Sequence, residues 1–160
     1  ISRSSSQRRK HVRHNEEDTA QRFEESQGQN MRYIVDSYAW LEYFMGTVAG
    51  EKVKKIIDSS ADEKLTPTIC VAEIYAKVLR VEGLERAELQ RAFIKLRSAV
   101  VSLTEEVAIE AAKIDVEMKK KVAGWGLADS IVLGTARKKR AKVLTGDEHF
   151  LNLEETTYIG

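Results

Sequence analysis

With 160 residues, the chain is long enough for one compact domain with a hydrophobic core and too short for two such domains. Its 26 basic and 25 acidic side chains leave a net charge of +1, which excludes a strong overall positive field for nucleic acid but not a local basic patch. The single cysteine, Cys70, excludes an intrachain disulfide and a cysteine-based zinc site, and no apolar run reaches the roughly 18 residues of a membrane span.

The first 30 residues differ in composition from the rest of the chain. Their only sizeable apolar side chains are Ile1, Val12 and Phe23, set among Arg, Ser, Gln, Glu and His. Such a segment buries too little apolar surface to offset the entropy lost on ordering. We interpret residues 1–30 as a flexible or non-native leader and residues 31–160 as the folded domain; a basic arm for RNA or a partner is the alternative. The polar start and the lone thiol predict a cytoplasmic protein without a membrane partner.

From residue 31 onward, apolar residues recur with the periods of strands and helices in turn. In chain order, we predict a strand over Tyr33–Asp36, helices over Ala39–Phe44 and Val48–Asp58, a strand over Lys64–Thr66, helices over Ile69–Val81 and Leu84–Ser98, a strand over Val100–Leu103, helices over Glu105–Lys120 and Ala128–Arg137, and strands over Lys142–Thr145 and Thr157–Ile159. The apolar set of the helix after Gly83 is Leu84, Ala87, Ala92, Phe93 and Leu96. Alternating strands and helices predict right-handed crossovers, and therefore a three-layer α/β/α fold with a central parallel sheet of four or five strands.

Four carboxylates are expected at one edge of this sheet. Asp36 ends the first strand, and Asp147 follows the Lys142–Thr145 strand by two residues. Glu73 lies near the start of its helix and Asp129 opens another helix, and both helices start near the same edge. In open parallel sheets, ligands bind beyond the carboxyl ends of the strands. The four acids therefore converge on one site if the sheet is built as predicted.

Each acid by itself could also serve only to stabilise the fold rather than to bind a metal. Asp36, Asp129 and Asp147 suit helix N-termini. Glu73, with Lys77 four residues later, suits an exposed salt-bridged stripe. Together, however, carboxylates about 5–6 Å apart repel by roughly 3 kcal/mol at an effective dielectric constant of about 20, and a bound divalent cation relieves that repulsion. Hard oxygen ligands without histidine or cysteine favour Mg²⁺ or Mn²⁺ over zinc.

These motifs resemble those of the PIN domain family. The stretches that carry the resemblance are Tyr33–Ser37 with Ala39–Leu41, Thr66–Thr68 with Val71–Tyr75, Gly126–Val132 with Thr135–Arg137, and Lys142–Asp147 with His149–Phe150. The last two resemble most closely the VapC-like branch, the toxins of toxin–antitoxin pairs. Four motifs in order, from Met31 to about Leu151, make the resemblance specific.

The resemblance implies an endoribonuclease that hydrolyses RNA phosphodiester bonds with one or two Mg²⁺ or Mn²⁺ ions. Its acidic positions, the metal ligands and catalytic residues, match Asp36, Glu73, Asp129 and Asp147. Its flanking hydroxyls, which hydrogen-bond these acids or their waters, match Ser37 and Thr145. The implied partners are an RNA substrate, a cognate antitoxin and a second copy in a homodimer.

Basic and aromatic side chains are the candidates for RNA contacts. They are Arg80, Lys119, Lys120, Lys121, Trp125 and Arg137. Trp125 follows the three lysines closely and offers a surface on which a base can stack. Arg137 opens a run of four basic residues, which also suits a solvated helix C-terminus. We interpret His149 as a packing or surface residue rather than a general base, and Cys70 as a core residue.

Three other interpretations stay open at this stage. A housekeeping PIN nuclease of ribosomal RNA processing or RNA quality control would use the same acids, but such proteins usually carry additional RNA-binding modules. A phosphoacceptor receiver or other regulatory module also uses magnesium and a strand-end aspartate, but it needs an adjacent acidic pair, whereas Ser37 and Tyr38 follow Asp36. A PIN fold that only binds RNA is the third, and the intact set of four acids argues against it.

Overall fold

Five parallel strands form the centre of the structure. The computed structural model describes residues 30–160, so the leader predicted over residues 1–30 lies outside the described residues except for Asn30. The strands are β1 (Arg32–Val35), β2 (Glu63–Pro67), β3 (Ala99–Val101), β4 (Lys142–Thr145) and β5 (Thr156–Tyr158). Their order is β3-β2-β1-β4-β5, and every neighbouring pair is parallel, which confirms the predicted sheet.

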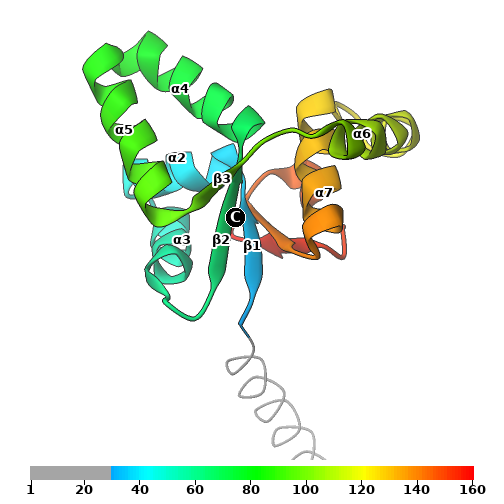
Figure 1. Ribbon diagram of the computed structural model, residues 1–160, viewed down its shortest axis with the longest axis horizontal. Helices are drawn as coiled ribbons and strands as arrows, with labels where there is room; N and C mark the ends of the chain where they lie inside the picture. Colours follow the sequence, from blue (N-terminus) through cyan, green and yellow to red (C-terminus); the bar gives the residue numbers. More distant parts are fainter. Residues whose placement is uncertain (1–29) are drawn as a thin grey trace, which may run out of the picture. The chain divides into compact units, whose positions relative to one another are not determined.

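Helices cover both faces of this sheet (Figure 1). One face carries α2 (Ser37–Met45), α3 (Val48–Asp58), α4 (Thr68–Glu82) and α5 (Leu84–Arg97), and the other carries α6 (Glu105–Met118) and α7 (Leu127–Lys139). A single 3-10 turn, η1 (Glu148–Phe150), connects β4 to the last strand. The predicted three-layer α/β/α architecture is therefore confirmed. Within residues 30–160, every helix is too short or too polar to cross a membrane.

The pleat of β1 builds a separate core on each face of the sheet. Tyr33 and Val35 pack into the cluster under α2–α5, where Trp40 is fully buried. Ile34, between them, packs into the cluster under α6 and α7 with Leu133. Alternate residues of a strand point to opposite faces, so a strand covered on both sides must be apolar at consecutive positions. This requirement explains the run Tyr33-Ile34-Val35 just before Asp36.

The apolar face predicted for α5 is only partly right. Ala87 is buried and Phe93 packs at the edge of the core, but Leu84, Ala92 and Leu96 are exposed. The positions that α5 buries are Ala87, Gln90 and Ile94. Their spacing of three and four residues defines one helix face. That face includes a polar residue and leaves out all three leucines of the helix, Leu84, Leu89 and Leu96. For α6, by contrast, the buried residues are Val107, Ala111, Ile114 and Met118, at the expected helical spacing.

Candidate metal centre

Two strands and two helices position the four acids. Asp36 directly follows β1, and Asp147 follows β4, which pairs with β1 in parallel. Asp129 is the third residue of α7, and Glu73 lies in the second turn of α4, the helix that starts where β2 ends. Each acid thus stands close to an element boundary, as the sequence predicts.

Burial and neighbouring negative charges raise the pKa values of Asp36, Glu73 and Asp129. The pKa of Glu73 rises to about 7, first through partial burial and then through the negative charges of Asp36, Asp129 and Asp147. The pKa of Asp129 is also raised, mainly by burial, against the lowering effect of a backbone hydrogen bond from Gly126. Like charges raise the pKa of a carboxyl only when they lie nearby. The structure therefore places the four acids that the sequence singles out within electrostatic range of one another.

Asp36 is the most deeply buried of the four, with 6% of its surface exposed. Burial raises the pKa of its carboxyl, against hydrogen bonds from Thr145 and the Ser37 backbone. The Thr145 hydroxyl donates to Oδ2 at 2.8 Å, and the buried thiol of Cys70 lies 3.6 Å from Oδ1. Although Asp36 occupies the N-cap position of α2, its side chain makes no capping hydrogen bond. Helix capping therefore does not account for this carboxylate.

The predicted hydroxyl contact of Thr145 is present, whereas Ser37 acts on Asp36 through its backbone. A role for the Ser37 hydroxyl stays a prediction. Cys70 is a core residue, as predicted, but it also lies directly beside Asp36, and nothing in the sequence indicates that contact. The thiol lies beside the Asp36 carboxylate because α4 packs near the end of β1.

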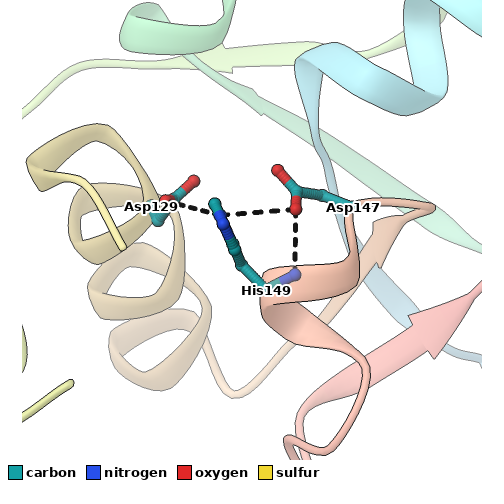
Figure 2. A group of neighbouring side chains, drawn as sticks. All are labelled: Asp129, Asp147 and His149. Carbon is teal, nitrogen blue, oxygen red and sulfur yellow. Dashed lines mark hydrogen bonds and ion pairs between the residues drawn. The ribbon is translucent and has the colours of Figure 1, made fainter. Parts of the chain in front are cut away.

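His149 lies within the acidic cluster (Figure 2). Its Nδ1 atom is 3.4 Å from Asp129 Oδ2 and 3.4 Å from Asp147 Oδ1. One ligand atom from each of these three residues lies within 4.8 Å of the others. The ring is partly exposed and packs beside Trp125, in keeping with our interpretation of His149 as a packing or surface residue, but that interpretation did not include its place between two of the acids. The signals in the sequence are its place two residues after Asp147 and its position in a stretch that resembles the family; the η1 turn that directs the ring back towards α7 leaves no periodic pattern.

Asp147 and Asp129 are each fixed by a backbone N–H group. The N–H of His149 donates to Asp147 Oδ1, and the N–H of Gly126 donates to Asp129 Oδ2, both at 2.9 Å. Local capping explains where these two oxygens point, in agreement with the expectation that Asp129 and Asp147 lie at helix N-termini. It also keeps two carboxylates close together, which is unfavourable unless a cation lies near them.

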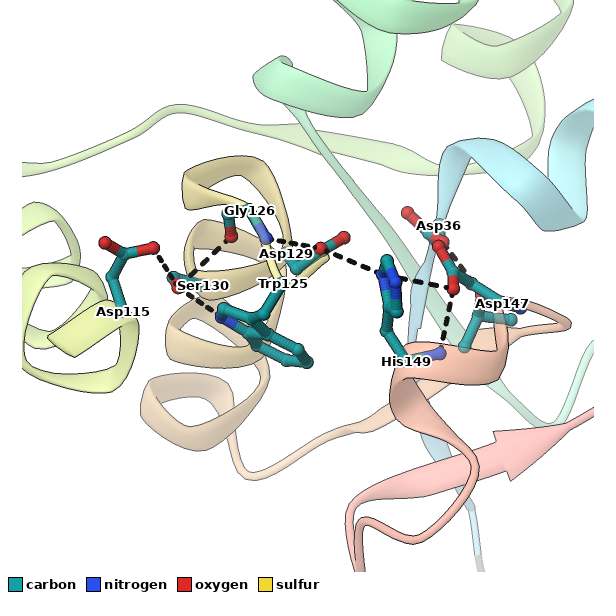
Figure 3. A network of polar contacts seen from close by, with 9 residues as sticks. Asp36, Asp115, Trp125, Gly126, Asp129, Ser130, Asp147 and His149 are labelled. Carbon is teal, nitrogen blue, oxygen red and sulfur yellow. Dashed lines mark hydrogen bonds and ion pairs between the residues drawn. The ribbon is translucent and has the colours of Figure 1, made fainter. Parts of the chain in front are cut away.

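A polar network holds the start of α7 against α6 (Figure 3). Trp125 Nε1 donates to Ser130 Oγ at 2.7 Å, and Ser130 Oγ lies 3.3 Å from Asp115 Oδ1 on α6. Trp125 is 3% exposed, so it cannot be the open stacking surface that we predicted for RNA. Its size and apolar surface place it in the core, where the indole N–H has a partner. Its role is to position the helix that carries Asp129.

The basic candidates for RNA contacts lie at the surface. Lys119 pairs with Asp115 and Lys121 with Glu117, at 2.8 and 2.6 Å, directly after α6. Arg137 pairs with Glu155 at 2.8 Å, and Arg80 and Lys120 are exposed. Exposed ion pairs are weak enough to exchange for phosphate contacts. The role of these residues in RNA binding stays a prediction.

The donor set of the cluster suits a divalent cation. Among residues 30–160, no lysine or arginine forms an ion pair with Asp36, Glu73, Asp129 or Asp147. Burial and the neighbouring carboxylates raise the pKa values of Asp36, Glu73 and Asp129, and His149 partly offsets the rise at Asp129. Carboxylate oxygens are the ligands that Mg²⁺ and Mn²⁺ prefer.

The fold is similar to that of solved toxin–antitoxin structures. A toxin–antitoxin complex from Klebsiella pneumoniae has 14% identity and a TM-score of 0.63, over 82% of this chain and 98% of that chain. VapBC2 from Rickettsia felis, bound to a DNA fragment from its promoter, has 12% identity and a TM-score of 0.64, over 80% and 97%. VapC20 from Mycobacterium tuberculosis, a sarcin–ricin loop cleaving toxin, has 20% identity and a TM-score of 0.63, over 76% and 95%. At such identities, the likeness establishes a shared fold.

A sequence profile establishes the family. No curated protein matches the chain by sequence. The profile of the PIN domain matches residues 33–155, from the second residue of β1 to the residue before β5. This range contains all four acids and confirms the resemblance seen in the sequence motifs. The chain therefore belongs to the PIN domain family.

Proposed function

We propose that this protein is a metal-dependent endoribonuclease that hydrolyses RNA phosphodiester bonds and serves as the toxin of a type II toxin–antitoxin pair. The observation that carries the proposal is the set of four carboxylates from the ends of β1 and β4 and the N-terminal turns of α4 and α7, without a lysine or arginine partner within residues 30–160. Membership of the PIN domain family supports a nuclease. The similar fold of a toxin that cleaves the sarcin–ricin loop supports RNA as the substrate class.

Asp36, Glu73, Asp129 and Asp147 would hold one or two divalent cations, Mg²⁺ or Mn²⁺, directly or through water. A bound divalent cation supplies an attacking water of lowered pKa and stabilises the leaving oxygen. The end of β1 and the Thr145 hydroxyl fix Asp36, and the first turn of α7 fixes Asp129. Glu73 is the most exposed of the four, and with a pKa of about 7 its carboxyl exchanges protons readily at neutral pH.

We also propose a cognate antitoxin and a second copy of this chain as partners. Two of the similar structures are complexes of a toxin with its antitoxin. In this chain, a groove of about 260 Å³ runs between α2, α4 and α5, and its apolar lining includes Phe44, Met45 and Val81. Val48 on α3 and Leu96 on α5 are also largely exposed. Exposed apolar surface of this kind is typical of protein contacts.

The test is RNA cleavage by Asp36→Asn, because amide and carboxyl groups have nearly the same shape, while the charge and one acceptor oxygen are lost. Purified protein is incubated with structured and unstructured RNAs in Mg²⁺, in Mn²⁺ and in chelator. We expect cleavage with either metal and none in chelator. The variant should lose more than the 10–100-fold that removal of an outer-shell partner typically costs, since Asp36 would be a ligand itself.

Asp58→Asn is the matched control, because it makes the same change at an exposed residue at the end of α3. It should cleave as the natural chain does. Circular dichroism of both variants checks that the fold is intact. Full activity of Asp36→Asn, or cleavage in chelator, would refute the proposal.

A further inference from the structure

The imidazole of His149 has a buried nitrogen atom without a hydrogen-bond partner. Nδ1 is shielded from solvent, and Asp129 Oδ2 and Asp147 Oδ1 each lie 3.4 Å from it, an ion-pair distance at which the geometry of a hydrogen bond is not met. Figure 2 shows the ring between the two carboxylates, with Nδ1 turned towards both. Buried polar atoms almost always have a partner, so an exception of this kind calls for an explanation, an unseen ion among them.

The two distances from Nδ1 are those of neighbouring ligands around one ion. Metal–ligand bonds of about 2.0–2.2 Å place neighbouring ligand atoms about 3.0–3.6 Å apart. The two nitrogen–oxygen distances of 3.4 Å lie within this range, and one ligand atom from each of the three residues lies within 4.8 Å of the others. The same separation is poor for a hydrogen bond, whose usual length is about 2.9 Å.

The surroundings of the ring fix the direction of Nδ1. Gly124 adopts a left-handed backbone conformation with φ of 78°, and a Cβ atom there would lie 3.1 Å from His149 Nε2. The indole of Trp125 lies close to the imidazole, with 6.4 Å between the ring centroids. The turn before α7 therefore packs against the ring on the side of Nε2, and Nδ1 faces the acids.

We propose that His149 is a direct metal ligand through Nδ1, together with Asp129 and Asp147, and that this nitrogen makes the centre prefer Mn²⁺ or a later first-row ion to Mg²⁺. The proposal rests on the metal centre of the proposed function and deepens it. Imidazole binds transition metals readily, whereas Mg²⁺ is held almost entirely by oxygen. The all-oxygen set expected from the sequence gives no such preference. The neutral ring would carry its proton on Nε2.

Electron spin-echo spectroscopy of the Mn²⁺-loaded protein tests the ligand directly. The full chain is prepared without an affinity tag, stripped of metal and loaded with one equivalent of Mn²⁺. A coordinated imidazole gives a nitrogen-14 modulation, which should disappear when histidine alone is labelled with nitrogen-15. If Mn²⁺ binds and no nitrogen-14 modulation is seen, the proposal is wrong. This measurement requires no variant and so does not depend on how a substitution affects folding.

His149→Asn assigns the signal to one of the three histidines of the chain. Asparagine offers an amide oxygen close to the position of Nδ1, so an oxygen ligand replaces a nitrogen ligand. We expect the modulation to vanish and the Mn²⁺ affinity, measured by calorimetry, to fall at least about tenfold. The Mg²⁺ affinity should change much less, so the preference for Mn²⁺ shrinks.

His14→Asn, the same substitution outside the described residues, is the control and should change neither measurement. An unchanged ratio of Mn²⁺ to Mg²⁺ affinity in His149→Asn would overturn the proposal and leave His149 as a partner of the two acids only. RNA cleavage is read separately. Nitrogen coordination without cleavage contradicts the proposed nuclease alone, and cleavage without nitrogen coordination contradicts the His149 proposal alone.

Discussion

A single hydroxyl group connects two of the acids. Thr145 Oγ1 donates to Asp36 Oδ2 at 2.8 Å and accepts the Asp147 N–H at 3.0 Å. Thr145 is fully buried at the end of β4, so water cannot replace either bond. The hydroxyl therefore fixes the carboxylate that follows β1 relative to the loop that follows β4.

Thr145→Val tests this contact, since valine has nearly the same shape and lacks the hydroxyl. The buried Oδ2 of Asp36 and the N–H of Asp147 each lose a partner, which should lower the free energy of unfolding by about 1–3 kcal/mol. The loss of an outer-shell hydrogen bond should slow RNA cleavage by about 10–100-fold. Urea unfolding and cleavage rates measure the two effects. Thr145→Ser keeps the hydroxyl and should retain most of the stability and most of the cleavage rate. Equal losses in the two variants would show that the hydroxyl is not responsible for either effect.

At the scale of single residues, the sequence predicts the acids better than their neighbours. Asp36 and Asp147 follow apolar strands, and a strand end is visible in the sequence. The positions of Cys70 and His149 depend on how α4 and η1 pack, and such packing has no period in the sequence. The prediction of an exposed stacking surface at Trp125 was wrong for a similar reason, because a tryptophan near lysines is equally consistent with a stacking surface and with a core residue.

At the scale of elements, α2 and α3 approach each other closely at Gly50. A Cβ atom at Gly50 would lie 2.1 Å from the carbonyl oxygen of Glu42, so these helices can approach only if residue 50 is glycine. We expect Gly50→Ala to force them apart and to lower the free energy of unfolding by about 1–3 kcal/mol, the typical cost of overpacking. Urea unfolding checks this value.

Gly134→Ala is the matched control for that substitution. Gly134 also lies inside a helix, α7, and a Cβ atom there would meet Ala111 at ordinary contact distances of 3.4 to 3.6 Å. Alanine favours a helix over glycine by roughly 0.5–1 kcal/mol, so this variant should be as stable as the natural chain or slightly more stable. A similar loss in both variants would show that the contact at Gly50 is not special.

The elements themselves follow closely from apolar periodicity. The α3 and β4 boundaries agree with the predicted ranges Val48–Asp58 and Lys142–Thr145, and most other boundaries differ by one or two residues. The buried face of α5, however, was predicted only in part. An amphipathic pattern does not show which of two adjacent rows of residues on a helix packs against the core. Gln90 is buried while Leu96 is exposed, so composition alone favours the wrong row.

At the scale of the whole molecule, the acidic cluster couples stability to pH. The folded-state pKa values of Asp36, Glu73 and Asp129 are raised, that of Glu73 to about 7. In the unfolded chain these carboxyls titrate near their ordinary values of about 4. Between about pH 4.5 and 7 the folded state therefore binds more protons, and the stability of the metal-free protein must fall as the pH rises through this window.

We expect the melting temperature of the metal-free protein to rise by a few °C on going from about pH 8 to about pH 5.5. Saturating Mn²⁺ should stabilise the protein more at the higher pH, since protons compete with the cation for the same oxygens. Scanning fluorimetry in chelator and in Mn²⁺ measures both trends. Glu73→Gln, which removes the carboxyl whose pKa is raised to about 7, should flatten the chelator curve. A melting temperature that falls steadily towards pH 5.5 in chelator would show that the pKa values of these clustered carboxyls are not raised in the folded protein.

The order of the strands has a consequence for synthesis on the ribosome. β1 lies between β2 and β4, and the bond from Thr145 to Asp36 joins residues that are 109 positions apart. A nascent chain that has already paired β1 with β2 still lacks Thr145, Asp147 and His149. Domains fold largely as they emerge, from the N-terminal end first. Under the proposed function, a half-made molecule is therefore harmless to the RNA around it, and cutting activity begins only when nearly the whole domain has left the exit tunnel.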